Sequence, residues 1–236
     1  MRLAVFSDIH GNVPALKTIL KHIKNNKIDK IICLGDVIGL GPESNECLKI
    51  INKEDLIFIA GNHELYYTKG IDEGHIRNKN ILKHNKWVHS TIKQKVNDDV
   101  LEYKITHKGK TLYFTHYFLR NKRYPYESTS LFDHKILCRK VLSRFNYDYI
   151  FYGHRHKDRL DEYKGHKFYG LDSSGCTKDD VTCYYLIEVK DDVSVEKIEL
   201  KYDRKKFEKI LNETEFPDKK HICEHFYGIK KSAKKF

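Results

Sequence analysis

The chain has 236 residues, with 44 Lys or Arg against 33 Asp or Glu, and its formal net charge at pH 7 is +11. No apolar run approaches the roughly 20 residues of a membrane-spanning helix, and the six scattered cysteines include no Cys-x-x-Cys pair, which argues against a disulfide scaffold or a thiolate metal site. We therefore expect a reduced, cytoplasmic protein with one α/β domain, no membrane partner and a preference for anionic ligands.

The first third of the sequence alternates short apolar runs with helical periodicity. Three runs predict buried strands: Leu3–Phe6, Ile31–Leu34 and Ile57–Ile59. After the first run, Asn12 can cap a helix whose apolar residues recur at helical spacing: Leu16, Ile19, Leu20 and Ile23. A second helix is expected after the Gly39–Pro42 loop, through Leu48 and Ile51. This order predicts a parallel sheet covered on both faces.

Beyond residue 64 the pattern changes. Residues 65–98 are polar and carry apolar residues at helix-like spacing: Ile81, Leu82, Val88 and Ile92. We therefore expect a helical cap inserted into a domain that spans residues 1–200. Later apolar runs flank turn signals at residues 107–110, 164–165 and 191–192, which predicts a second sheet of antiparallel strands. These runs are Tyr103–Ile105, Leu112–Phe114, Tyr149–Tyr152, Tyr184–Val189 and Val193–Leu200.

Residues 201–236 predict a helical extension that packs on the same domain. Asp203 can cap one helix, with Phe207, Ile210 and Leu211 facing inward. Pro217 ends this helix, because proline lacks the backbone N–H that a helix interior requires.

Five predicted strands end in residues that can bind a metal ion. The segments that follow the strands are Asp8-Ile9-His10, Gly35-Asp36, Gly61-Asn62-His63-Glu64, His116 and Gly153-His154-Arg155-His156. In α/β sheets the ligand crevice lies beyond the carboxyl ends of the strands, so these segments can converge on one site. Each motif alone has an ordinary interpretation as a turn, a surface pair or a core histidine. Together, carboxylates and imidazoles gathered without a cation would be costly to bury.

The residue types in these segments suit divalent transition metals. Carboxylate, amide and imidazole donors without a thiolate favour Mn, Fe, Ni, Co or Zn over a structural zinc bound by cysteines. The candidate ligands are Asp8, His10, Asp36, Asn62, His116, His154 and His156. Seven ligands are too many for one tetrahedral site and fit two metal ions that share a carboxylate. We expect two divalent metal ions as cofactors, with Mn favoured.

The ordered motifs resemble the calcineurin-like metallophosphoesterase superfamily, and residues 35–46 resemble its small bacterial and archaeal phosphodiesterase branch. The match spans residues 1 to about 200. The resemblance implies an α/β protein with a four-layer α/β/β/α sandwich, the metallo-dependent phosphatase fold. It also implies two ligand sets that share one carboxylate. One metal would be held by Asp8, His10, Asp36 and His156, and the other by Asp36, Asn62, His116 and His154.

A reaction is implied as well. A hydroxide bridging the two metals would attack the phosphorus, and His63 would be the catalytic residue that donates a proton to the leaving oxygen. The enzyme predicted in this way is a metal-dependent phosphoric ester hydrolase. Its expected substrate is a small phosphate ester or nucleotide, and a phosphodiesterase is the favoured activity.

Differences from the motifs of two related enzyme classes narrow the predicted substrate class. In phosphoprotein phosphatases and symmetrical dinucleoside tetraphosphatases, an Arg near these motifs binds phosphate and a carboxylate orients the acid histidine. Here those places hold Gly39, Leu40 and Ala60, which argues against a phosphoprotein phosphatase and leaves the orienting partner of His63 unassigned.

Other functions stay open as alternatives. A dinucleoside polyphosphate hydrolase or a nuclease would use the same centre, although a nucleic-acid partner is disfavoured because the sequence lacks a basic-aromatic stripe. From another class, the chain could be a non-catalytic metal-binding interaction subunit. The presence of all seven ligands and His63 argues against that role.

The sequence also suggests positions or roles for a few residues outside the ligand set. Arg155 lies between two histidines and is expected to point away from the metals. Glu64 could orient a ligand or cap the following turn. His75, His134 and the Tyr117–Tyr126 stretch could approach a substrate. The remaining histidines are expected to be surface or structural: His22, His84, His89, His107, His166, His221 and His225.

Overall fold

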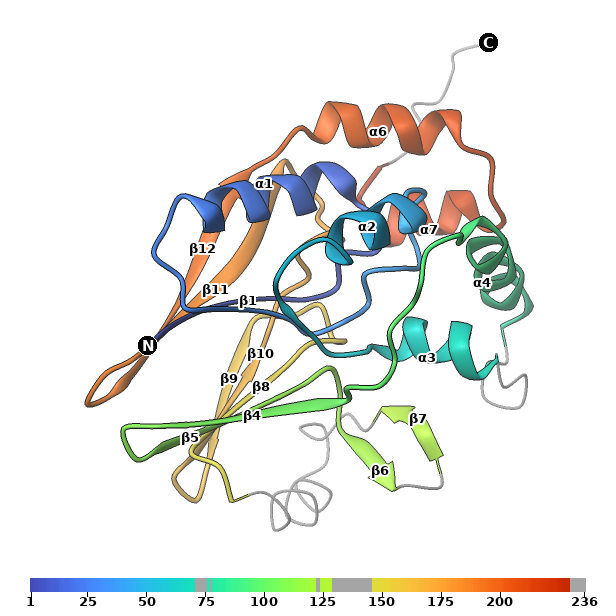
Figure 1. The fold of residues 1–236 in the computed structure, drawn as a ribbon. Helices are drawn as coiled ribbons and strands as arrows, with labels where there is room; N and C mark the ends of the chain where they lie inside the picture. Colours follow the sequence, from blue (N-terminus) through green and yellow to red (C-terminus); the bar gives the residue numbers. More distant parts are fainter. Residues whose placement is uncertain (71–75, 77, 122–123, 129–145, 230–236) are drawn as a thin grey trace.

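Two five-stranded sheets pack face to face in the computed structural model (Figure 1). It describes residues 1–70, 76, 78–121, 124–128 and 146–229, with backbone alone for residues 119–121 and 124–128. Sheet A has the strand order β12-β11-β1-β2-β3, and sheet B has the order β4-β5-β8-β10-β9. Helices α1 (Val13–Lys24) and α2 (Ser44–Ile51) cover the face of sheet A that points away from sheet B. The predicted sandwich of sheets flanked by helices is confirmed.

Sheet A combines the N-terminal strands with a late hairpin. Its strands are β1 (Arg2–Phe6), β2 (Lys30–Cys33), β3 (Ile57–Phe58), β11 (Val181–Val189) and β12 (Val193–Lys201). As predicted, β1, β2 and β3 are parallel. The β11–β12 hairpin joins the same sheet, because β11 pairs antiparallel with β1 and places Ile187 opposite Leu3. The expectation that this hairpin belongs to the second sheet is wrong, since a hairpin signal does not indicate which sheet edge the hairpin joins.

Sheet B is mixed. Its strands are β4 (Glu102–His107), β5 (Lys110–Thr115), β8 (Tyr149–Tyr152), β9 (Arg159–Tyr163) and β10 (His166–Gly170). The central strands β5, β8 and β10 are parallel, so the prediction of an antiparallel second sheet is wrong. The turn signals mark only the edge hairpins β4–β5 and β9–β10, because parallel pairing uses long connections without a local signature. Strands β6 (Leu119–Asn121) and β7 (Tyr124–Ser128) form a separate two-stranded sheet.

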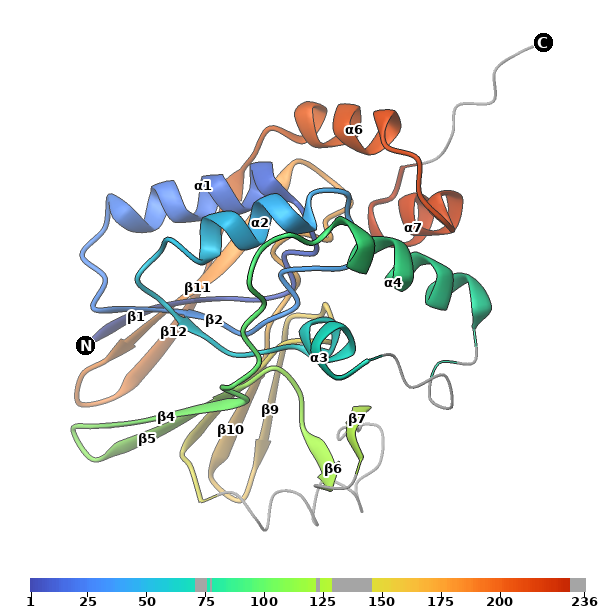
Figure 2. The same ribbon diagram turned by 45° about the vertical axis from the view of Figure 1, so that its right-hand side comes forward.

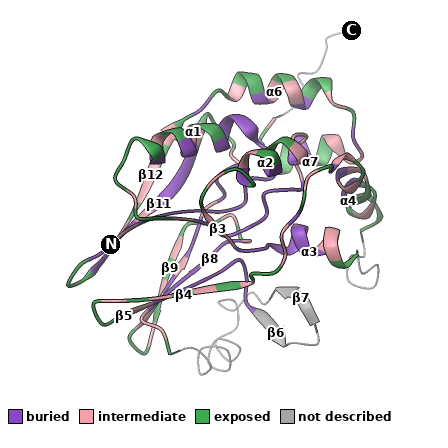
Figure 3. Cartoon of the chain, viewed as in Figure 1, coloured by how far each residue is buried: buried purple, intermediate pink, exposed green. Residues whose placement is uncertain are grey.

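The core lies between the sheets and beneath the helices (Figure 3). Fully buried residues between the sheets include Leu3, Val5, Ile32, Phe114 and Phe151. On the other face of sheet A, α1 buries the four residues predicted from helical spacing: Leu16, Ile19, Leu20 and Ile23. Asn12 Oδ1 accepts a hydrogen bond from Ala15 N at 3.1 Å, so the predicted helix cap is confirmed.

Two helices occupy the region predicted as a cap. Helix α3 (Asn62–Lys69) begins inside the Gly-Asn-His-Glu segment, so this motif is a strand-to-helix turn. Helix α4 (Lys79–Thr91) buries His84, Asn85 and Val88, whereas Ile81 is 40% exposed. The apolar spacing therefore indicated the helix and the burial of Val88, but not the burial of His84 and Asn85. His75 and His134 lie outside the described residues, and the domain boundaries stay predictions.

The C-terminal segment forms two helices within its described residues, 201–229. Helix α6 (Arg204–Glu213) buries Phe207 and Leu211 as predicted, and Asp203 Oδ1 accepts a hydrogen bond from Lys206 N at 3.0 Å. Helix α7 (Lys219–Phe226) follows Pro217 and was not predicted. Figures 1 and 2 place α7 beside α4. Among the described residues, no helix combines the length and the apolar character that a membrane span requires.

Candidate metal centre

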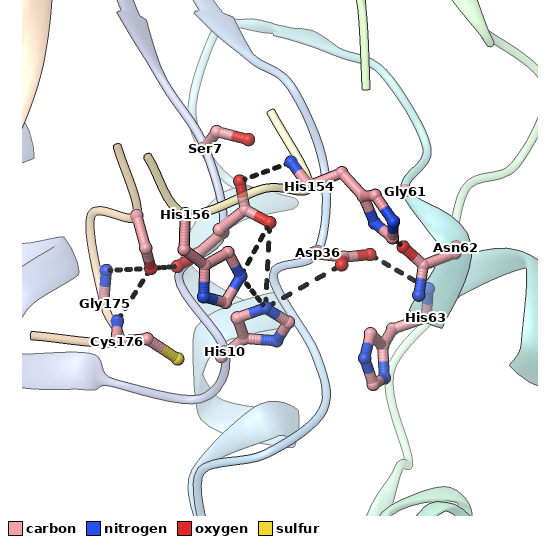
Figure 4. A network of polar contacts seen from close by, with 12 residues as sticks. Ser7, His10, Asp36, Gly61, Asn62, His63, His154, His156, Gly175 and Cys176 are labelled. Atoms are coloured by element: carbon pink, nitrogen blue, oxygen red, sulfur yellow. Dashed lines mark hydrogen bonds and ion pairs between the residues drawn. The ribbon is translucent and has the colours of Figure 1, made fainter. Parts of the chain in front are cut away.

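The candidate ligands follow the carboxyl ends of parallel strands from both sheets. Figure 4 shows the labelled members of this group close together: His10, Asp36, Asn62, His154 and His156. Asp8 and His10 follow β1, and Asp36 follows β2. The turn from β3 into α3 contributes Asn62 and His63. The sheet B residues are His116 after β5, and His154 and His156 after β8. The structure thus brings all eight predicted site residues together.

One group of donors surrounds Asp8. The His156 Nε2 atom lies 3.2 Å from Asp8 Oδ1, and His10 Nε2 lies 3.7 Å from the same oxygen. The two imidazole nitrogens are 3.1 Å apart. Three potential ligand atoms therefore converge on one point.

A second group surrounds Asn62. Its Oδ1 atom lies 3.1 Å from His116 Nε2 and 2.7 Å from His154 Nδ1. Asp36 lies between the two groups, because its Oδ2 atom is 3.7 Å from His10 Nε2 and 3.2 Å from His116 Nε2. The donors thus form two clusters that share one carboxylate.

Backbone carbonyls orient two of the imidazoles. His10 Nδ1 lies 3.0 Å from Ile38 O, and His116 Nδ1 lies 2.7 Å from Leu34 O. A carbonyl only accepts hydrogen bonds, so each Nδ1 carries a proton and each Nε2 points into the cluster, where the neutral ring can offer a lone pair to a metal ion. Metal-binding histidines commonly show this arrangement.

Burial and charge shift the pKa values within the cluster in opposite directions. Burial raises the pKa of Asp36, but the charges of His116 and His63 lower it by a larger amount. The pKa of Asp36 therefore lies well below its usual range. Burial lowers the pKa of His116, yet the charge of Asp36 raises it to about 9. Burial followed by the charge of His116 lowers the pKa of His154 to about 4. Asp36 thus requires a neighbouring positive charge, which a metal ion can supply in place of a proton.

The donor set fits a divalent metal ion. Asp8 Oδ1 is buried and accepts no well-aligned hydrogen bond, although two imidazole nitrogens face it. A buried carboxylate oxygen without a partner is costly, and a cation between these atoms would remove that cost. The mixture of carboxylate, amide and imidazole donors is typical of sites for Mn, Fe, Co, Ni or Zn.

Backbone conformation also marks the cluster. Nine described non-glycine residues have a positive φ, and five of them are candidate ligands, with φ between 47° and 68°. These five are Asp8, His10, Asp36, His154 and His156. Such conformations cost about 1–3 kcal/mol each and persist where the surroundings enforce them, as happens at functional sites.

Glu64 joins two of the ligand-bearing loops. Its Oε2 atom accepts hydrogen bonds from Asp36 N and Gly61 N, both at 2.8 Å. Its Oε1 atom accepts from Val37 N at 2.9 Å and Ile38 N at 3.2 Å. The carboxylate thus caps α3 and holds the loop after β2, so both alternatives considered from the sequence apply. Burial, followed by the charge of Asp36, raises the pKa of Glu64 to about 7.

His63 is held by packing. Its backbone N donates to Asp36 Oδ1 at 2.9 Å, and its ring makes an edge contact with His10, with centroids 5.0 Å apart. A Cβ atom on Gly39 would lie 2.3 Å from His63 Nδ1, and Gly39 has a φ of +94°, so glycine makes room for the ring. No described carboxylate forms a hydrogen bond with the ring. Burial lowers the pKa of His63 to about 3.

A cavity of about 690 Å³ opens from this cluster. Arg155 is exposed and also lines the cavity, so the expectation that it points away from the metals stays a prediction. Residues that sequence analysis missed also line it: His84, Asn85, Cys176, Lys178, His221, Ile222, His225 and Phe226. Most belong to α4 and α7. No motif marks them, because only the packing of distant helices brings them to the site.

Cys176 lies beside two of the candidate ligands. Its Sγ atom and one nitrogen each of His10 and His156 all lie within 4.8 Å of one another. Cys176 is therefore a potential ligand or ligand neighbour, although the spacing of the cysteines gave no such signal. Tyr117, from the predicted aromatic stretch, packs on His116 and His154 with centroids 5.4 and 5.5 Å away. The side chains of residues 119–126 lie outside the described part of the chain.

Comparison with known proteins agrees with this geometry. The sequence model for the calcineurin-like phosphoesterase family matches residues 1–158. The chain belongs to this family. As expected for a calcineurin-like phosphoesterase, groups of residues are present that could hold metal ions.

Individual relatives extend the likeness to most of the chain. The uncharacterized protein MJ0912 of Methanocaldococcus jannaschii is 33% identical over 234 aligned residues, which cover 89% of this chain and 91% of that protein. The hypothetical protein PH1004 from Pyrococcus horikoshii OT3 has a TM-score of 0.77 at 18% identity, covering 97% and 99% of the two chains. A structure described as a novel archaeal phosphodiesterase has a TM-score of 0.50 at 16% identity, covering 85% and 100%. These two structures share the fold.

Proposed function

We propose that this calcineurin-like phosphoesterase is a two-metal phosphodiesterase that hydrolyses small phosphate esters or nucleotides. The observation that carries the proposal is the position of Asp36 between two groups of donors. Its Oδ2 atom is within 3.7 Å of His10 Nε2 and 3.2 Å of His116 Nε2, so one carboxylate can bridge two ions. Manganese is the favoured ion because hard oxygen donors are mixed with imidazoles.

The ligand assignment follows the two clusters. One ion would be held by Asp8, His10, Asp36 and His156, and the other by Asp36, Asn62, His116 and His154. When bound, such ions act as Lewis acids toward phosphate oxygens and lower the pKa of a water molecule from about 15.7 to about 7. The contribution of the chain is rigid placement, because Glu64 and the carbonyls of Leu34 and Ile38 fix the ligands.

His63 is assigned to the leaving oxygen. Its ring lines the cavity beside Asp36, where it can donate a hydrogen bond or a proton to the departing alkoxide. With its pKa near 3, the free imidazole is neutral at pH 7. The negative charge of a bound phosphate would raise that pKa, in the same direction as the charge of Asp36 does.

The cavity supports a small substrate over a phosphoprotein. At about 690 Å³ it has the size of a small-molecule pocket, and helices α4 and α7 contribute to its lining. The absence of phosphate-binding Arg residues at Gly39, Leu40 and Ala60 points the same way. The fold shared with an archaeal phosphodiesterase is consistent with this substrate class.

The test compares the chelated protein with protein reloaded with Mn²⁺, using bis(p-nitrophenyl) phosphate and p-nitrophenyl phosphate. We expect turnover only after reloading, with a higher kcat/KM for the diester. A protein that binds Mn²⁺ but hydrolyses neither ester would support the non-catalytic alternative. A preference for the monoester would contradict the assignment as a diesterase.

A further inference from the structure

The cavity beside the candidate metal centre is larger than a phosphate group requires. Its volume of about 690 Å³ falls in the range of pockets that enclose whole small molecules. The candidate ligands form only part of its lining, and much of the remainder comes from α4 and α7. The part of the substrate beyond the phosphate therefore has a defined place to bind.

Helix α7 supplies an apolar surface next to the candidate ligands. Phe226 and Ile222 line the cavity, and the Phe226 ring lies 6.2 Å from that of His156, measured between centroids. Leu40 and Ile81 add aliphatic surface. Ile81 is one of three large apolar residues that are exposed among the described residues. Because it lines the cavity, its exposed surface is available to contact a bound ligand.

Helix α4 adds a polar group that lacks a partner. Asn85 lines the cavity, is only 2% exposed, and its Nδ2 atom has no hydrogen-bond partner among the described residues. A buried amide that lacks a hydrogen bond destabilises the protein. A ligand with a hydrogen-bond acceptor beside Asn85 would recover that cost. The lining thus combines an aromatic face, aliphatic surface and an amide.

The α7 side of the cavity is fixed to the loop that carries His10. Tyr227, directly after Phe226, is fully buried, and its hydroxyl donates a hydrogen bond to His10 O at 3.2 Å. Arg204 Nη2 donates to Tyr227 O at 2.6 Å and so ties the end of α7 to the start of α6. These contacts hold the end of α7 in place, which lowers the ordering cost of binding on this side of the cavity.

We propose that α4 and α7 bind the organic group of the substrate and select a ring-bearing group of nucleoside size. The ring system would stack on Phe226 and contact Ile222, while a polar edge of the base meets Asn85. This inference rests on the proposed phosphodiesterase function, and it assigns substrate choice to α4 and to the C-terminal helix that the sequence did not predict.

The test uses two esters that share a leaving group. Thymidine 5′-(p-nitrophenyl) phosphate and methyl p-nitrophenyl phosphate both release p-nitrophenolate, so the ratio of their kcat/KM values isolates recognition of the retained group. Base–aromatic stacking contributes about 1–3 kcal/mol, which corresponds to about 5- to 150-fold, so we expect the Mn²⁺-loaded protein to favour the thymidine ester by a factor in this range. The Phe226→Ala variant should lose most of that ratio, and Asn85→Leu a smaller part.

Glu224→Ala is the matched control, because Glu224 is an exposed residue of α7 that does not line the cavity. It should keep the wild-type ratio. A wild-type ratio near one would overturn the inference while leaving the hydrolase assignment intact. Equal losses on both esters in Phe226→Ala would also overturn it, because they would indicate a structural role.

A binding measurement keeps the inference testable without turnover. Calorimetric titration of the Mn²⁺-loaded protein with thymidine 5′-monophosphate and with methyl phosphate should show about tenfold tighter binding of the nucleotide, lost in Phe226→Ala. This result in a protein that hydrolyses no ester would refute the proposed function but support the binding role of α7. Equal affinities would refute the binding role.

Discussion

The strand-end loops and the α4–α7 side of the cavity meet at one site but differ in how the sequence encodes them. The loops carry short motifs in which each ligand sits within a few residues of a strand end, and five of the ligands adopt a positive φ. The α4–α7 side combines residues 78–85 with residues 218–226, and no motif links them. In the proposed function, reaction chemistry is therefore encoded locally, whereas substrate choice depends on packing between distant segments.

Replacement of His63 should have the largest effect. For an ester with an alkoxide leaving group, His63→Ala is expected to reduce kcat about 10²- to 10⁴-fold, because the leaving oxygen loses its proton donor. For p-nitrophenyl esters the loss should be much smaller, since p-nitrophenolate departs without a proton. His166→Ala, on strand β10, is the control. Equal losses on both classes of ester would show that His63 does not protonate the leaving group.

Glu64→Gln tests how far the strand-end loops depend on their shared anchor. An amide has one acceptor oxygen, so two of the four backbone N–H groups that Glu64 binds would lose their partner, at about 1–3 kcal/mol each. We expect a lower midpoint in urea unfolding and Mn²⁺ affinity reduced about 10- to 100-fold. Glu46→Gln, an exposed change on α2, should alter neither quantity. Unchanged Mn²⁺ affinity in Glu64→Gln would show that the hydrogen bonds of Glu64 do not contribute to metal binding.

Tyr227→Phe tests the connection between the two regions and should have the smallest effect. Loss of the hydrogen bond to His10 O should destabilise the protein by about 1 kcal/mol, or about 2–4 °C in Tm for a chain of this size. The activity ratio between thymidine and methyl esters should fall slightly as the end of α7 loosens. Tyr103→Phe is the control, because the hydroxyl of Tyr103 makes no hydrogen bond with described residues. A Tm equal to that of this control would show that the contact does not join the two regions.

Much of the fold and of the site could be predicted from local patterns. The parallel strands β1 to β3, helix α1 with its Asn12 cap, and the convergence of the candidate ligands all follow from periodicity and strand-end position. The position of the β11–β12 hairpin beside β1 could not be predicted, because strand alternation indicates burial and not the neighbouring strand. The parallel centre of sheet B was missed for the same reason.

The residues lining the cavity were missed for a different reason. Helix α7 contains few apolar residues, among them Ile222, Cys223 and Phe226, set among lysines, histidines and a glutamate, so its hydrophobic pattern is weak. His84 and Asn85 are polar but buried, and both line the cavity. His84 also contacts the carbonyl of Pro217 through its Nδ1 atom. The Ile222/Phe226 spacing of four residues was the one signal that could have indicated α7.

The central claim is that the strand-end residues form a two-metal centre bridged by Asp36. Calorimetric titration of the chelated protein with Mn²⁺, checked by elemental analysis, tests this most directly. The proposal predicts two equivalents per chain in the wild type, and weakened binding of both ions in Asp36→Asn, because the shared oxygen serves both sites. A single equivalent in the wild type, or full binding of two ions in Asp36→Asn, would contradict it.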